Sequence, residues 1–136
     1  MLKLKFTNIV VFLILKYIMF FTLLAFIGDR FKSIVIKNSD NFSEIISNSF
    51  YYMIYPLIAT IGYALLFSIP FYFAFRVKKA IYFIFTVLSI LTAEYFIYSY
   101  VDSPSDFRNG IYNGVLTLLF LTLFFYKKII LFFKLD

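Results

Sequence analysis

Four long apolar runs, separated by short polar segments, divide the chain. They cover residues 6–27, 51–75, 80–100 and 110–128. A helix rises ~1.5 Å per residue, so each run is long enough to cross the ~30 Å hydrocarbon core of a bilayer. The fourth run either continues past Lys127 and Lys128, with those side chains extended towards the interface, or its last apolar residues, 129–133, lie in the interface. The pattern predicts four transmembrane helices.

The first run follows two lysines, Lys3 and Lys5, and a basic start is also typical of secretory signal peptides. The run is longer than the apolar core of such a peptide, and Lys16 interrupts it. No small-residue cleavage site of the A-x-A type follows it. We therefore expect an uncleaved first helix.

A polar segment, residues 28–50, joins the first two runs and is the only sizeable predicted loop. Within it, Asn41 precedes Phe42-Ser43-Glu44, a variant of the capping box with Asn41 as N-cap and Glu44 at position N3. Phe42, Ile45 and Ile46 then share one face of a helix. We predict a short amphipathic helix that lies in the membrane interface and leads into the second span.

Composition agrees with the pattern, because hydrophobic residues make up 63% of the chain and charged residues only 15%. A soluble domain is nearer half apolar and a quarter charged. A chain of 136 residues has too little polar surface to cover so much apolar mass. The predicted fold is therefore all-α: a single domain over residues 1–136, a polytopic four-helix transmembrane bundle whose solvent is the lipid bilayer.

Basic residues near the helix ends predict the orientation, since cytoplasmic loops carry more Lys and Arg. With the N-terminus inside, eight basic residues lie on the inner side and four on the outer side: Lys3, Lys5, Arg76, Lys78, Lys79, Lys127, Lys128 and Lys134 against Arg30, Lys32, Lys37 and Arg108. This bias predicts a multi-pass protein of the plasma (inner) membrane with both termini in the cytoplasm. The net charge of +6 is thereby explained by topology, without a nucleic-acid partner.

Two ionisable residues fall inside the apolar runs, and such residues are functional hypotheses by default. Lys16 lies ~15 Å and Glu94 ~21 Å from the inner edge of the membrane at ~1.5 Å per residue. An extended lysine side chain bridges that difference if the first and third helices touch. We therefore consider a buried ion pair of Lys16 and Glu94, a titratable Glu94 in transport, and two side chains that extend separately to the interfaces.

Small residues mark two candidate packing faces. Thr60, Ala64 and Ser68 recur every four residues in the second run, and Gly110 and Gly114 form a GxxxG pattern at the start of the fourth. Asn113 and Thr117 lie on the same side as these glycines. Close backbone approach and hydrogen bonds between helices drive association in lipid, so we expect helix packing at both stripes. Packing within the chain is favoured over packing between subunits.

The segment before the fourth run holds Asp102, Asp106 and Arg108, which could form a carboxylate site. No third acidic ligand lies near them in the sequence. We expect a solvated turn around Pro104 instead.

The chain contains no Cys and no His, which excludes disulfides, thiol chemistry, imidazole bases and the usual zinc and haem ligands. We expect no cofactor, no metal and no enzymatic activity. The leading hypothesis is protein–protein contact within the membrane, as an accessory or assembly subunit or as an immunity-type protein that blocks a toxin in the bilayer. The partner is another membrane protein or a second copy. The alternative is a small oligomeric transporter or channel that uses Glu94 and Lys16.

Overall fold

The computed structural model describes residues 5–27, 29–101 and 106–134, and these residues contain helices but no strand. The elements are α1 (Phe6–Ile27), η1 (Lys32–Ile36), α2 (Phe42–Ala74), α3 (Ala80–Phe96), η2 (Ile97–Val101) and α4 (Phe107–Lys134), where η1 and η2 are single π-helical turns. Four helices are long and apolar enough to cross a membrane, η2 extending α3 to Val101. The predicted all-α class is confirmed, whereas Lys3, Asp102 and Asp136 lie outside the described residues.

Each long helix packs on two neighbours in the order of the chain. α1 packs against α2, α2 against α3, α3 against α4, and α4 against α1. Among the described residues, no Cα of α1 lies within 8 Å of one in α3, and the same is true of α2 and α4. The four helices therefore stand at the corners of a quadrilateral, with α1 diagonal to α3.

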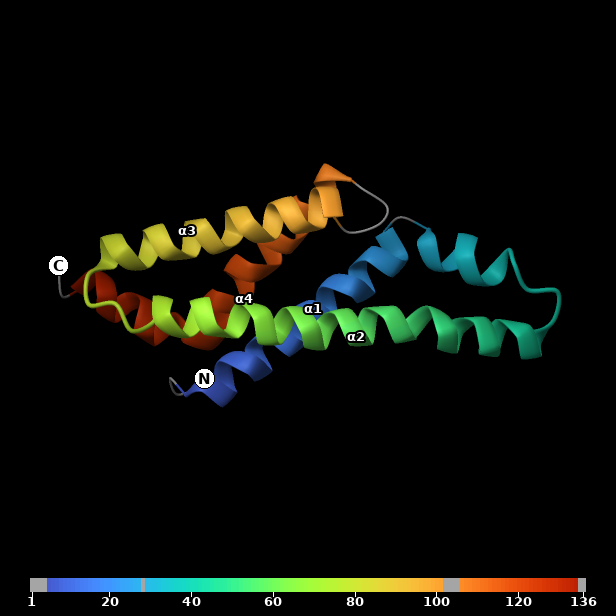
Figure 1. Ribbon diagram of the computed structural model, residues 1–136, viewed down its shortest axis with the longest axis horizontal. Coiled ribbons are helices and arrows are strands. Elements are labelled where there is room, and N and C mark those ends of the chain that lie inside the picture. Colours follow the sequence, from blue (N-terminus) through green and yellow to red (C-terminus); the bar gives the residue numbers. More distant parts are fainter. Residues whose placement is uncertain (1–4, 28, 102–105, 135–136) are drawn as a thin grey trace.

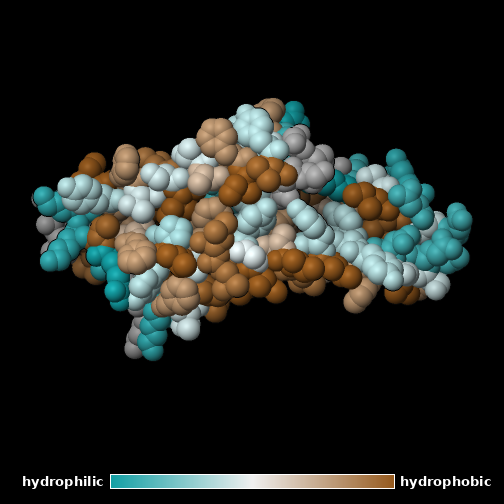
Figure 2. Space-filling model, in the orientation of Figure 1, coloured by the Kyte–Doolittle hydropathy of each residue, from teal (hydrophilic) through white to brown (hydrophobic). Residues whose placement is uncertain are grey.

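The helices alternate in direction along the long axis of the molecule (Figure 1). α1 begins and α4 ends near the turn that joins α2 to α3, and the α1–α2 and α3–α4 connections lie at the opposite end. We call these the inner and the outer end, after the orientation that the sequence predicts. Hydrophilic residues gather at both ends of the face shown in Figure 2, and hydrophobic and neutral residues fill the band between them. This distribution suits a molecule whose middle is solvated by lipid.

The second helix differs from the prediction at its start. Residues 42–74 form one continuous helix, so the predicted interfacial helix is the first part of α2 and not a separate element. Asn41 caps it as predicted: its side chain accepts a hydrogen bond from Glu44 N at 2.9 Å. No proline or glycine lies between Asn41 and the apolar run, so the helix continues into that run. It spans about 50 Å at ~1.5 Å per residue and extends past the other long helices at the outer end (Figure 1).

The inner half of the bundle is held by a set of aromatic rings that we call the phenylalanine cluster: Phe12, Phe71, Phe75, Phe83 and Phe125. Ring centroids lie 5.4 Å apart for Phe12 and Phe125, and 4.5 Å apart for Phe75 and Phe125. Phe71 and Phe83 complete the cluster at 5.7 Å from Phe12 and 5.4 Å from Phe75. Because all four long helices or their ends contribute a ring, the cluster fills the centre of the inner half.

The fourth helix continues past its two lysines to Lys134. Lys127 is exposed and Lys128 is half-buried. This arrangement fits side chains that leave the apolar surface towards the interface.

Candidate functional site

Lys16 and Glu94 form an ion pair at the centre of the bundle. Lys16 Nζ lies 2.7 Å from Glu94 Oε1, and both side chains have 0% exposure. The ammonium group also lies over the ring of Tyr17, 4.1 Å from its centroid, where the electron-rich face attracts a cation. The two side chains that the sequence singled out are therefore brought together.

Both oxygens of the Glu94 carboxylate accept further hydrogen bonds. Tyr17 donates its hydroxyl to Oε1 at 2.5 Å. Asn113 Nδ2 donates to Oε2 at 2.8 Å, and the Thr117 hydroxyl lies 3.1 Å from the same oxygen. The Thr117 hydroxyl has one proton, which it shares between Oε2 and the Asn113 carbonyl oxygen at 2.9 Å. A buried carboxylate is stable when its charge is paired and its lone pairs are bonded, and Glu94 meets both conditions.

This group, which we call the polar cluster, crosses the diagonal of the bundle. Its members come from α1 (Lys16 and Tyr17), α3 (Glu94) and α4 (Asn113 and Thr117). The backbones of α1 and α3 do not touch in the described residues, so the two side chains meet across the space between the helices. Contact between these two helices was the condition considered for the pair, and their side chains meet across the diagonal without it.

The ring of Tyr17 links the polar cluster to two further tyrosine rings, those of Tyr63 and Tyr98. The centroids of Tyr63 and Tyr98 are 5.1 Å apart, and those of Tyr17 and Tyr63 are 5.9 Å apart. The ring of Phe20 packs on Tyr98 at 4.7 Å. With Tyr63, α2 also contributes to this region, so every long helix takes part in it.

The predicted stripe on the second helix is buried along its whole length: Thr60 is 3% exposed, and Ala64 and Ser68 are 0% exposed. α2 packs against α1 and α3, which cover this face. The Ser68 hydroxyl donates to the Leu65 carbonyl at 2.8 Å, so it is satisfied within its own helix.

The two glycines of the GxxxG pattern have different surroundings. A Cβ atom on Gly110 would lie 2.5 Å from Ser99 Oγ and 2.8 Å from the Tyr95 carbonyl oxygen. A Cβ on Gly114 would meet nothing within 4 Å. Gly110 therefore lets α4 approach the end of α3 closely. Gly114 instead lies in a hollow of about 270 Å³ between α3 and α4, lined also by Leu91 and Tyr95.

Buried polar residues continue from the polar cluster towards the outer end. Asn109, Asn113 and Thr117 follow each other at intervals of four on α4, and each is at most 3% exposed. Arg30 Nη2 donates to Asn109 Oδ1 at 3.2 Å. Asn113 Oδ1 has no hydrogen-bond partner among the described residues. These residues form a polar file along one face of α4.

The polar file ends at a cavity of about 90 Å³ that Arg30, Asp106, Arg108 and Asn109 line. Asp106 Oδ1 accepts a hydrogen bond from Arg108 N at 2.9 Å at the start of α4, and Pro104, around which the turn was expected, lies outside the described residues. Asp102, the other carboxylate considered there, lies outside the described residues.

The sequence did not identify Tyr17, Asn113 and Thr117 as partners of Glu94. Asn113 and Thr117 stood out only as polar residues beside the glycines, and Tyr17 only follows Lys16 in the chain. The interval between Asn113 and Thr117 places them on one face of α4, but whether this face meets Glu94 depends on the rotation of α4 about its axis.

The chain matches no protein-family model, no curated protein and no solved structure.

Proposed function

We propose that the protein spans the plasma membrane with four helices and acts by contact with another membrane protein. It is then an accessory or assembly subunit, or an immunity-type protein that blocks a toxin within the bilayer. The observation that carries this proposal is that the polar groups of the polar cluster are bonded to one another inside the bundle. Glu94 is paired, its two oxygens are bonded and its exposure is zero, so the most reactive residues of the chain serve to hold the helices together.

A surface feature supports contact between helices. The hollow between α3 and α4 has Gly110 and Gly114 in its floor and Leu88, Thr92 and Ile111 among its other lining residues. Gly114 is the position where nothing of this chain comes within 4 Å of an added Cβ. Transmembrane helices associate where small residues let backbones approach. A partner helix that packs here would extend the same mode of packing that Gly110 uses within the chain.

A matched pair of glycines tests the proposal. Gly114→Leu would fill the hollow, and Gly62→Leu would place the same side chain on α2, where an added Cβ also meets nothing within 4 Å. Each variant is purified gently from the native membrane, and the copurifying proteins are identified. We expect the wild type and Gly62→Leu to retain a partner that Gly114→Leu loses. A partner retained equally by all three proteins, or a monodisperse homo-oligomer without a partner, would contradict the proposal.

The polar file favours a second candidate function, a small transporter or channel that uses Glu94 and Lys16. The file links the outer cavity to the carboxylate, and Asn113 Oδ1 offers an unbonded acceptor on the way. The phenylalanine cluster closes the opposite half, so transport would need those rings to separate. Proton flux or conductance in liposomes distinguishes the two functions. A transporter would show flux that Glu94→Gln abolishes, whereas an accessory subunit would show no flux in the wild type or in the variant.

A further inference from the structure

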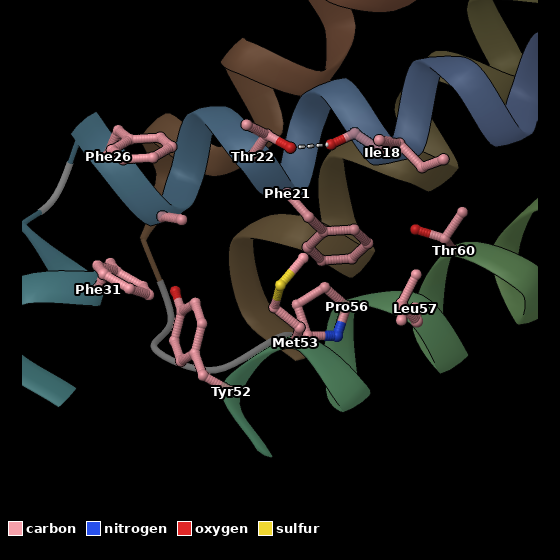
Figure 3. A pocket seen from close by; sticks show the side chains of 11 residues that line it. Ile18, Phe21, Thr22, Phe26, Phe31, Tyr52, Met53, Pro56, Leu57 and Thr60 are labelled. Carbon is pink, nitrogen blue, oxygen red and sulfur yellow. Dashed lines mark hydrogen bonds between the residues drawn. The ribbon is translucent and has the colours of Figure 1, made fainter. Parts of the chain in front are cut away.

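A second cavity lies between α1 and α2 in the outer half of the bundle, away from the polar cluster. It has a volume of about 150 Å³. Figure 3 shows its lining side chains, which come from α1, from α2 and from Phe31 at the start of η1. Phe21, Met53, Pro56 and Leu57 form apolar walls. The cavity is therefore a small, largely apolar space that no residue of the proposed function uses.

Aromatic rings define one end of the cavity. Phe26, Phe31 and Tyr52 lie there, and the rings of Phe31 and Tyr52 meet edge to face at 5.7 Å. The cavity is partly open to the surface, and a volume of about 150 Å³ with apolar walls is large enough for a single benzene ring. Aromatic walls favour a ring as occupant, because edge-to-face and offset contacts add to the burial of apolar area.

The opposite end of the cavity holds one polar group, the hydroxyl of Thr60. Figure 3 shows this oxygen on the side of Thr60 that faces Phe21 across the cavity. The Thr60 side chain is 3% exposed and lines the cavity, and its hydroxyl has no hydrogen bond to another described residue. A hydroxyl that faces apolar surroundings without a hydrogen-bond partner is unfavourable.

The other threonines that lie within the helices, past the first turn, differ from Thr60 because their hydroxyls are bonded. Thr22, Thr86, Thr92, Thr117 and Thr122 each donate to the carbonyl oxygen four residues earlier, at 2.7–2.9 Å. Thr60 could turn towards the Pro56 carbonyl in the same way, but its hydroxyl is directed into the cavity. An oxygen on the occupant would satisfy it.

We propose that this cavity binds a neutral, membrane-soluble ring compound of phenol size, whose single oxygen hydrogen-bonds to the Thr60 hydroxyl. The class includes phenols and the head groups of quinones, whose oxygens accept a bond from a hydroxyl. A lipid acyl chain matches the cavity less well, because its methylene groups cannot accept a hydrogen bond from the Thr60 hydroxyl. The inference is independent of the contact surface proposed on α3 and α4.

A matched pair of ligands tests the site. The protein is placed in lipid nanodiscs, and the binding of 4-fluorophenol and fluorobenzene is followed by fluorine NMR, with empty nanodiscs as the reference for partition into lipid. We expect 4-fluorophenol to bind about 2- to 10-fold more tightly, the effect of one hydrogen bond. Equal binding of the two ligands would overturn the proposal.

Variants assign the binding to the cavity. Thr60→Val keeps the shape and removes the hydroxyl, so both ligands should bind with the weaker affinity, and Thr60→Ser should restore the difference. Ala25→Leu places a larger side chain in the cavity wall and should abolish binding, whereas Gly62→Leu on the open face of α2 should not. Unchanged binding in Ala25→Leu would show partition into lipid only. Displacement of 4-fluorophenol by a saturated fatty acid as effectively as by phenol would assign the cavity to a lipid chain instead. Either result overturns the proposal.

Discussion

The two halves of the bundle hold the same four helices together by different means. In the inner half, the phenylalanine cluster fills the centre with rings whose centroids lie 4.5–5.7 Å apart. In the centre and outer half, the polar cluster holds one carboxylate with a lysine, a tyrosine, an asparagine and a threonine. Ring contacts are many and tolerant of small shifts, whereas hydrogen bonds to a charge are few and directional.

This difference matters more in lipid than in water. If lipid surrounds the bundle, as we propose, its tails are as apolar as phenylalanine, so the hydrophobic effect does not favour contact of the inner rings and only their packing does. A charge left unpaired in hydrocarbon is strongly unfavourable, so the polar cluster disfavours every arrangement that separates Lys16 from Glu94. The polar cluster therefore specifies which faces meet, and the phenylalanine cluster supplies contact area.

The largest expected effect comes from breaking the ion pair on one side only. Glu94→Leu or Lys16→Met leaves an uncompensated buried charge and should destabilise the bundle by about 3–5 kcal/mol. The double variant removes both charges and should recover most of that loss. Unfolding in mixed detergent micelles, monitored by circular dichroism, measures all four proteins. Additive losses in the double variant would show that the two residues do not act as a pair.

The second effect tests the phenylalanine cluster. Phe12 is wholly buried, and Phe12→Ala should cost about 2 kcal/mol, less than the loss in a water-soluble core, because only packing is lost. Phe26, which is 69% exposed, provides the control, and Phe26→Ala should change stability little. The same unfolding assay applies. A loss at Phe12 equal to the loss at Glu94 would remove the distinction between the two halves.

A third, smaller effect concerns the approach of α4 to α3 beside the polar cluster. Gly110→Ala places a methyl group against Ser99 and the Tyr95 backbone and should destabilise by about 1–2 kcal/mol, a typical cost of overpacking. Gly114→Ala adds the same methyl to open space and should be neutral or slightly stabilising, since alanine favours a helix. Equal effects of the two substitutions would show that the close approach at Gly110 is unimportant for stability.

The smallest effect is expected for a single donor to Glu94. Thr117→Val keeps the shape of the side chain and removes one shared hydrogen bond, so a loss of about 0.6 kcal/mol is expected, the average for a bond between helices in lipid. Combined with Glu94→Leu, the substitution should have no further effect, because the acceptor is gone. Stability measurements on the single and double variants check this. An undiminished effect in the absence of Glu94 would place the role of Thr117 elsewhere, for example at the Asn113 carbonyl.

The hydrophobic runs predicted most of the fold, because the length of each run gives the approximate length of one helix. The first helix has the predicted bounds, Phe6–Ile27, since a polar segment follows it at once. The start of α2 was missed because the amphipathic residues after Asn41 continue into the apolar run without a breaker. Because α2 begins at Phe42, Pro56 lies well inside the helix.

The candidate site was predictable in part, for a geometric reason. The depths of Lys16 and Glu94 follow from residue counts along two helices, which is why a pair could be anticipated. The rotation of each helix about its own axis does not follow, because apolar residues surround every span and leave no clear buried face. The roles of Tyr17, Asn113 and Thr117 depend on that rotation.

The sequence by itself determined four apolar helices, their alternating order and two charges at similar depth, since these depend on composition and length along the chain. Only the tertiary structure decided that α1 and α3 are diagonal, that α4 turns its polar file inward, and that Gly110 is packed while Gly114 is open. Those outcomes come from contacts between residues far apart in sequence, such as Lys16 with Glu94. The ion pair that the sequence suggested is thus completed by Tyr17, Asn113 and Thr117, whose contacts with Glu94 the sequence alone did not predict.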